Sequence, residues 1–205
     1  MMTVCMLTVA YLCGSLPFGV WIGRWVGVDV RRRGSGNVGA TNVARTAGRR
    51  AGLLTLVGDV AKGALPAVLA QFLFVDTWVI ALVGLAAVFG HLFSVFLRFS
   101  GGKGVATAFG VFVVLTPAAA ALSAVVFAAA AILTRYVSLA SILGALALPI
   151  TAVIFRYPTS LCTVTAMVST IIIWRHRDNV ARLFSGAEPQ FGVPRSRPRN
   201  PAIDP

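Results

Sequence analysis

The sequence predicts an all-α polytopic membrane protein with seven transmembrane helices, some of them short or broken. Of its 205 residues, 58% are hydrophobic and only 12% are charged, and the mean hydropathy is +0.85. A soluble domain of this length does not bury so much apolar surface, so lipid is expected to cover most of the chain.

The apolar residues form runs that approach the ~20 residues with which a helix crosses ~30 Å of hydrocarbon. The runs lie at 3–26, 52–75, 77–97, 105–116, 118–134, 138–156 and 159–175. The first run lacks a cationic start and a cleavage site, which favours a retained span over a signal peptide. Pro117 interrupts the helix after the short fourth run, so 105–134 forms either one kinked span or two short spans.

The positions of Lys and Arg decide between these two alternatives. Two spans, with the N-terminus outside, place every cation inside except Arg156, which lies outside, and Lys62, which lies within a span. One span would move Arg135 and the C-terminal arginines outside. Seven spans with a cytoplasmic C-terminus are therefore expected. The net charge of +12 fits this distribution better than nucleic-acid binding, because no aromatic-rich basic module or zinc finger accompanies it.

One integral membrane domain, residues 1–186, is expected, followed by a Pro- and Arg-rich mobile cytoplasmic tail, residues 187–205. The cysteines lie within apolar runs without C-x-x-C spacing and are interpreted as small buried hydrophobic residues. The two histidines and six acidic residues do not cluster with ligand spacing, so no metal site is expected.

Two glycine-rich segments beside basic residues predict anion binding. Glycine lets backbone N–H groups turn toward an anion, and Arg adds a two-pronged donor that suits phosphate. The first segment follows Arg31–Arg33, and a plain basic loop would not explain its interleaved Gly, Ser and Asn. Its candidate ligands are Gly34, Ser35, Gly36, Asn37, Gly39, Thr41, Asn42 and Arg45, and the last two would share a helix face if a helix begins after the loop.

The second segment contains Gly101, Gly102 and Lys103, just before an apolar run. It lacks the G-x-x-x-x-G-K-[ST] spacing of a nucleotide-binding loop. Lys103 directly before a helix start would nevertheless be well placed for an anion.

The remaining polar residues of the spans are expected at the same inner end. His91 lies near the end of the third run; Ser138 with Ser141, and His176 with Asn179, are helical neighbours. Asp59 and Lys62 are also neighbours, and they either form a structural ion pair or support a polar pocket. The serines either line the pocket or only bond carbonyls one turn back.

Taken together, these segments resemble the bacterial membrane acyl-phosphate:glycerol-3-phosphate acyltransferase family, usually called PlsY. The matching segments occur in the family's order: 14–19, 34–42, 58–63, 90–93, 101–107, 138–141 and 176–179. One departure is Ser94, where the family commonly has proline.

The resemblance implies transfer of a fatty acyl group from acyl phosphate to the 1-hydroxyl of sn-glycerol 3-phosphate, at the cytoplasmic side of the bacterial inner membrane. The products would be lysophosphatidic acid and phosphate, without a cofactor. Membrane lipid is a further partner, and the enzyme that makes acyl phosphate is a candidate one. The acyl chain is expected between helices, where it is reached from the lipid, without a separate apolar cavity.

The resemblance also assigns roles to residues. Ser35 and the first glycine loop are expected to bind one phosphate, while Arg45, Lys103, Ser141, His176 and Asn179 bind glycerol 3-phosphate. These six are the expected catalytic residues, and His91 is a further candidate. His176 could act as a general base, but the family is thought to use the substrate's own phosphate, so His176 is expected to bind and orient. The alternative function is a transporter of phosphate or an organophosphate, which would place polar groups near the bilayer midplane.

Overall fold

The computed structural model describes residues 1–192, and every regular element in that part of the chain is a helix. In chain order the helices are α1 Met2–Ser15, α2 Phe18–Trp25, α3 Ala40–Ala47, α4 Arg49–Leu73, α5 Thr77–Leu92, the 3₁₀ turn η1 Val95–Leu97, α6 Val105–Leu115, α7 Pro117–Thr134, α8 Val137–Ile154, α9 Thr159–Arg175 and α10 Arg177–Phe184.

Five segments of the described chain are long and apolar enough to cross a membrane, judged by length and composition: Met2–Trp25, Arg49–Leu73, Thr77–Leu97, Pro117–Thr134 and Val137–Ile154. The apolar helices α6 and α9 are shorter.

Proline residues set two of the helix boundaries. Residues 105–134 form two helices: α6 ends at Leu115, and Pro117 occupies the first turn of α7. The first apolar run, expected at 3–26, is one candidate span, Met2–Trp25, but it consists of two helices. α1 ends at Ser15 and α2 begins at Phe18, because Pro17 has no N–H to continue the helix.

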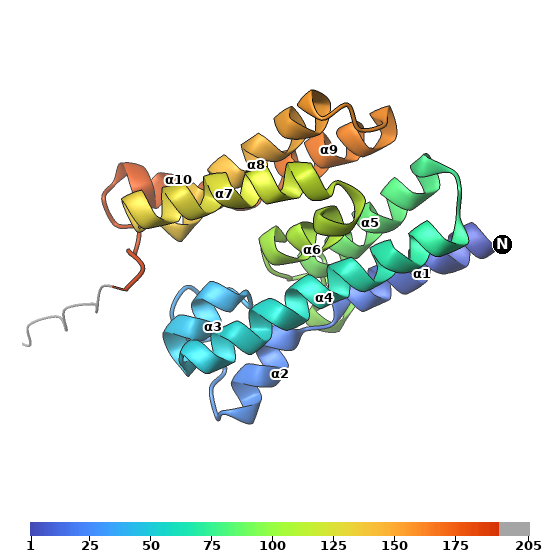
Figure 1. Ribbon diagram of the computed structural model, residues 1–205. Coiled ribbons are helices and arrows are strands. Elements are labelled where there is room, and N and C mark those ends of the chain that lie inside the picture. The colour runs from blue at the N-terminus through green and yellow to red at the C-terminus, as the bar shows by residue number, and fades with distance from the viewer. Residues whose placement is uncertain (193–205) are drawn as a thin grey trace, which may run out of the picture.

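The helices form two groups (Figure 1). In one group α1 packs on α5 and α4 packs on α6; in the other α7 packs on α8, and α8 on α9. α6 also contacts α7, and α5 contacts α9, so the groups are joined along the middle of the molecule. The short helices α2, α3 and α10 all lie toward the same end of the bundle (Figure 1).

Reciprocal glycines bring two helix pairs into close contact. A Cβ at Gly14 would overlap the carbonyl of Ala87 on α5, and one at Gly90 would overlap α1. Likewise a Cβ at Gly63 of α4 would overlap the carbonyl of Thr107, and one at Gly110 of α6 would overlap that of Val60. Small residues at such crossings are typical of membrane helices, whose backbones pack closely without a hydrophobic driving force.

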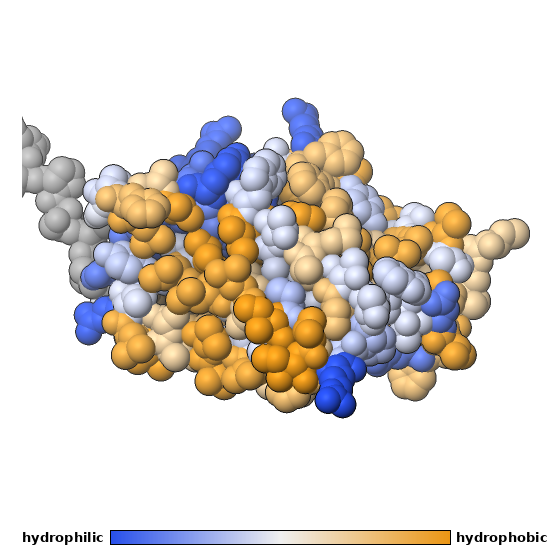
Figure 2. Space-filling view, turned by 90° about the horizontal axis from the view of Figure 1, so that it is seen from above, coloured by the Kyte–Doolittle hydropathy of each residue, from blue (hydrophilic) through white to orange (hydrophobic). Residues whose placement is uncertain are grey.

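The surface of the bundle is apolar. Large side chains such as Leu54, Phe72, Ile132 and Val153 are exposed, whereas the core consists mainly of Ala and Val. The face shown in Figure 2 carries broad apolar areas, with strongly hydrophilic residues mostly at its margins. This is the distribution expected for a protein whose solvent is lipid.

Candidate functional site

A cavity of about 780 Å³ opens among α3, α4, α6, α7, α8, α9 and α10. Its wall includes all the expected binding residues except Gly101 and Gly102. The members are Gly34, Ser35, Gly36, Asn37, Gly39, Thr41, Asn42, Arg45, His91, Lys103, Ser138, Ser141, His176 and Asn179. Residues far apart in sequence thus meet in one place.

The first glycine loop is braced by Asn42. Gly34 and Gly36 adopt φ angles of +64° and +71°, which side chains rarely tolerate. The Asn42 amide group donates to the carbonyls of Val30, Arg33 and Asn37 at 2.8–3.1 Å, and its Oδ1 accepts from the Ser35 N–H at 3.0 Å. The Asn42 side chain, expected as a ligand, is therefore occupied in shaping the loop.

A helix does begin after this loop, as the expectation for Arg45 required. α3 starts at Ala40, so Thr41 and Arg45 lie one turn apart and both line the cavity. The Asn37 side chain accepts from the Gly39 N–H at 2.8 Å and so shapes the entry to α3.

Lys103 reaches the cavity from the second glycine loop, just before α6. Its ammonium donates to the side-chain oxygen of Asn179 on α10. Burial lowers the pKa of Lys103 to about 8, and nearby Arg182 and Arg175 act in the same direction. The amine is therefore still mostly protonated at neutral pH.

Gly101 and Gly102 lie behind the cavity wall and position Lys103. Their N–H groups donate to the carbonyls of Leu92 and His91, each at 3.1 Å. The Arg175 guanidinium donates to both glycine carbonyls at 2.8 Å. Arg175 was not among the expected site residues, although it directly precedes His176.

His176 is buried at the junction of α9 and α10. Its Nδ1 lies 2.8 Å from the carbonyl of Ile172, which can only accept, so Nδ1 carries the proton and Nε2 is free to accept. Burial, and then the charge of Lys103, lower the pKa of His176 to about 4. The imidazole is thus neutral at physiological pH and a weak base.

The serines of α8 lie on its first turns. Ser138 and Ser141 are buried and both line the cavity. The Ser141 hydroxyl donates to the carbonyl of Val137 one turn back at 2.7 Å, so its lone pairs remain available to a ligand.

Glu188 was not anticipated. Its carboxylate accepts from the Asn179 amide at 2.7 Å and from Arg182 Nε at 2.8 Å. Burial alone would raise the pKa of Glu188, but these hydrogen bonds lower it. Arg182 follows Asn179 by one helical turn, a spacing that could have identified it; a lone acidic residue in a Pro- and Arg-rich segment offered no such signal.

Residues just beyond the expected domain boundary at 186 contact the membrane helices. Besides the contacts of Glu188, the Phe191 N–H donates to the carbonyl of Arg135 at the end of α7, at 2.7 Å. The part of the expected mobile tail from 193 to 205 lies outside the described residues.

The inner part of the cavity is apolar. Phe109 and Phe112 of α6, Ala124 and Phe127 of α7 and Leu148 of α8 line it. No apolar cavity was expected for the acyl chain, but the structure has an apolar compartment that joins the polar residues in the same cavity.

Asp59 and Lys62 form an ion pair, with Lys62 Nζ 2.8 Å from Asp59 Oδ1. Asp59 lines the large cavity and Lys62 does not. Among residues 1–192 no group of three or more His, Cys, Asp or Glu is placed to hold a metal ion.

Comparison with known proteins identifies relatives of this arrangement. A family model described as glycerol-3-phosphate acyltransferase matches residues 4–186. A glycerol-3-phosphate acyltransferase of Geotalea daltonii is 46% identical over 182 residues, covering 89% of this chain and 94% of that protein. One from Trichlorobacter lovleyi is 48% identical over 184 residues, with the same coverage.

Solved structures agree. The glycerol 3-phosphate form of PlsY (YgiH), an integral membrane glycerol 3-phosphate acyltransferase, has a TM-score of 0.90 at 41% identity and covers 94% of this chain and 96% of its own. The lysophosphatidic acid form of PlsY has a TM-score of 0.88 with the same identity and coverage. From its sequence, its fold and these relatives, the chain belongs to the glycerol-3-phosphate acyltransferase family.

Proposed function

We propose that this protein transfers a fatty acyl group from acyl phosphate to the 1-hydroxyl of sn-glycerol 3-phosphate, giving lysophosphatidic acid and inorganic phosphate. Acylation of glycerol 3-phosphate follows from the family; the donor and the residue roles are the proposal. The observation that carries it is a single cavity in which a cationic polar part continues into an apolar compartment. An activated lipid with an anionic head fits both parts.

The polar part suits two phosphate groups. Two anions repel each other at close range, so holding both requires several cations and amides. Arg45, Lys103, Arg175 and Arg182 line the cavity. In the proposed arrangement the first glycine loop, with Ser35, binds one phosphate, and Arg45, Lys103, Ser141, His176 and Asn179 bind glycerol 3-phosphate.

The chemistry needs little beyond positioning, because acyl phosphate is an activated mixed anhydride. The glycerol hydroxyl oxygen forms a bond to the acyl carbon, and the bond from that carbon to the phosphate oxygen breaks. The released phosphate takes the hydroxyl proton. His176 supports this route, because an imidazole with a pKa of about 4 is a weak base but offers Nε2 as an acceptor that orients the hydroxyl.

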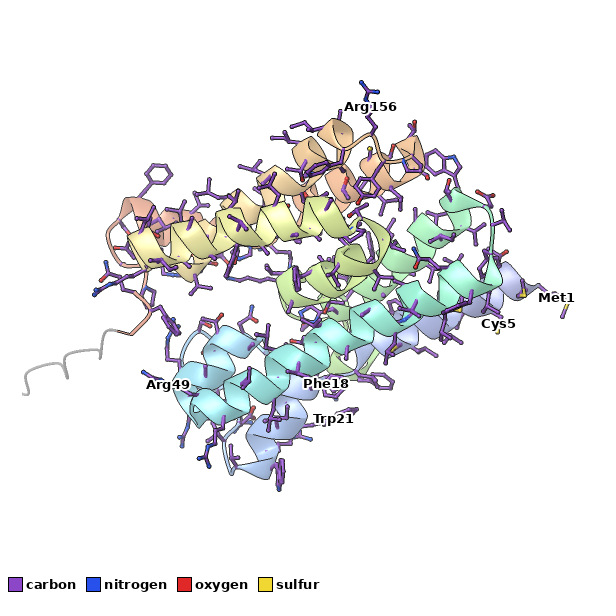
Figure 3. All side chains as sticks on the ribbon, viewed as in Figure 1. Met1, Cys5, Phe18, Trp21, Arg49 and Arg156 are labelled. Carbon is purple, nitrogen blue, oxygen red and sulfur yellow. The ribbon has the colours of Figure 1, made fainter. Side chains whose placement is uncertain are left out.

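The proposed orientation has seven spans in the bacterial inner membrane, with an outside N-terminus and the cavity facing the cytoplasm. The positive-inside rule supports it. Arg49 lies toward the end of the bundle that carries α2 and α3, whereas Met1 lies at the opposite end (Figure 3). The cavity residues of α3 and α10 belong to helices at one end of the bundle (Figure 1), which argues against a transporter with a midplane site.

A donor assay tests the proposal. Purified protein in lipid vesicles receives labelled glycerol 3-phosphate with palmitoyl phosphate, palmitoyl-CoA or palmitoyl acyl carrier protein. Lysophosphatidate and equimolar phosphate are expected with palmitoyl phosphate alone. Product from palmitoyl-CoA and none from palmitoyl phosphate would refute acyl phosphate as the donor.

A variant tests the proposed site. Arg45→Ala should lower kcat/KM for glycerol 3-phosphate roughly 10- to 100-fold, since it removes a charged hydrogen-bond donor.

A further inference from the structure

Asp59, Lys62 and His91 form a cluster inside the helix bundle, and their exposed fractions are only 2%, 4% and 5%. Beyond its ion pair with Lys62, Asp59 Oδ1 lies 3.6 Å from His91 Nδ1. Ionisable groups in a membrane span are costly and are usually retained for a specific use. The reaction described above leaves this cluster without a role.

Lys62 connects the cluster to the break between α1 and α2. Its ammonium donates to the carbonyl of Leu16 at 2.8 Å, directly before Pro17. The neighbouring end of α5 is tied to α1 as well: the Ser94 hydroxyl donates to the carbonyl of Ser15 at 2.6 Å, and Tyr11 donates to that of Phe93 at 2.7 Å. These hydrogen bonds hold the end of α5 near His91 to α1, and α4 to the segment between α1 and α2.

His91 in turn contacts the loop that carries Lys103. Its carbonyl accepts from the Gly102 N–H at 3.1 Å. The imidazole lies directly on Gly102: a Cβ at that position would overlap Nε2 and would lie 3.0 Å from Cε1 and 3.2 Å from Cδ2. A side chain at position 102 would therefore require the imidazole, or the loop itself, to shift.

Arg175 holds the same two glycines from α9 through their carbonyls. The loop is thus held by His91 of α5 and by Arg175 of α9, and Lys103 directly follows the two glycines. A cluster that served stability alone would not need to contact this loop.

We propose that Asp59, Lys62 and His91 are positioning residues: they form a buried network that sets the loop Gly101–Gly104, and through it the Lys103 ammonium, for binding glycerol 3-phosphate. In this proposal the network acts through the loop, although Asp59 and His91 also border the cavity. The inference rests on the proposed role of Lys103 and extends the site into the interior of the bundle.

A double-mutant cycle tests the contact between His91 and the loop. The dissociation constant for glycerol 3-phosphate is measured by calorimetry on detergent-purified protein, without any acyl donor. His91→Ala and Gly102→Ala should each raise the dissociation constant about tenfold. Independent effects would raise it about a hundredfold in the double variant. We expect a much smaller increase, because the new methyl group fills space left by the imidazole. Strictly multiplicative effects, or normal binding by His91→Ala, would overturn the proposal.

The ion pair is tested by the double variant Asp59→Asn with Lys62→Met. Removing both charges leaves no unpaired buried charge, so this variant should fold. We expect about tenfold weaker glycerol 3-phosphate binding, because His91 and Leu16 lose their charged partners, with little change in KM for acyl phosphate. Unchanged glycerol 3-phosphate binding with only a lower melting temperature would show that the pair is purely structural.

Ser160→Ala is the matched control, because it removes a buried hydrogen bond to Thr77 Oγ1, 3.0 Å long, away from the cavity. It should lower thermal stability and leave glycerol 3-phosphate binding unchanged. A wrong acyl donor would give a different result from a wrong positioning role. Wild-type protein would then bind glycerol 3-phosphate yet form no lysophosphatidate from acyl phosphate. The binding measurements need no acyl donor, so they would still test the positioning role.

Discussion

At the scale of single residues, burial determines what His176 and Lys103 can do. Both side chains are expected from their types to carry or transfer protons near neutral pH. Their surroundings lower both pKa values, to about 4 for His176 and about 8 for Lys103. His176 is therefore a neutral hydrogen-bonding group at physiological pH. Lys103 remains mostly a cation there, but its pKa lies close to that pH.

His176→Gln should retain most of the turnover. Glutamine keeps a donor and an acceptor but cannot shuttle a proton, so we expect kcat to fall less than about tenfold, whereas loss of a general base costs 10²–10⁴-fold. Steady-state kinetics with both substrates give the answer, and His176→Ala serves as the variant that removes both hydrogen bonds. A thousandfold loss in His176→Gln alone would show that His176 is the base.

The basic limb of the pH profile should report Lys103. The ammonium is the form that binds an anion, so kcat/KM for glycerol 3-phosphate should be steady up to about pH 7, fall to about half near pH 8 and decrease about tenfold per pH unit well above it. In Lys103→Arg this limb should disappear from the accessible range, since arginine stays charged. A wild-type profile that stays flat to pH 9.5 would contradict the assignment.

At the scale of helices, glycine contacts set how closely α4 and α6 approach. Gly110→Val should lower the melting temperature by about 5 °C, because overpacking a close crossing costs about 1–3 kcal/mol. Ala121→Val adds comparable bulk at an exposed position of α7 and should leave the melting temperature unchanged. Equal melting temperatures for both variants would show that the crossing tolerates a side chain.

The apolar compartment between α7 and α8 makes a separate prediction about the acyl chain. A Cβ at Gly144 would lie 3.3 Å from Phe127 Cβ, so Gly144→Leu should narrow this compartment. We expect kcat/KM to fall about tenfold for palmitoyl phosphate and less for octanoyl phosphate, with KM for glycerol 3-phosphate unchanged. Equal losses for both chain lengths would place the chain elsewhere.

At the scale of the whole molecule, the proposed orientation makes the two ends of the bundle differ in accessibility. In a variant with Cys5, Cys13 and Cys162 replaced by alanine, Arg156→Cys should react with an impermeant maleimide added outside intact cells. Ser185→Cys should react only after the membrane is permeabilised. The reverse pattern would invert the topology and move the cavity to the outer side.

Much of this arrangement could be predicted from local patterns in the sequence. Apolar runs locate the helices, Pro117 separates α6 from α7, and the glycines beside Arg and Lys identify two segments that meet at one cavity. These features depend on neighbouring residues only. Helical spacing also predicts that Ser138 with Ser141, and His176 with Asn179, share a face.

The structural role of each residue in the site could not be predicted in this way. Asn42 braces a loop, Gly102 lies behind the wall against His91, and Glu188 enters from beyond the last membrane helix. Each role depends on a partner distant in the chain, so no local pattern contains it.

The sequence by itself determined that the chain lies in lipid, where its helices run, and that it handles phosphate, because hydropathy and glycine–cation spacing are local properties. Only the tertiary structure decided which polar groups face the cavity and which ones hold them, because burial and hydrogen-bond partners arise when separate helices pack together.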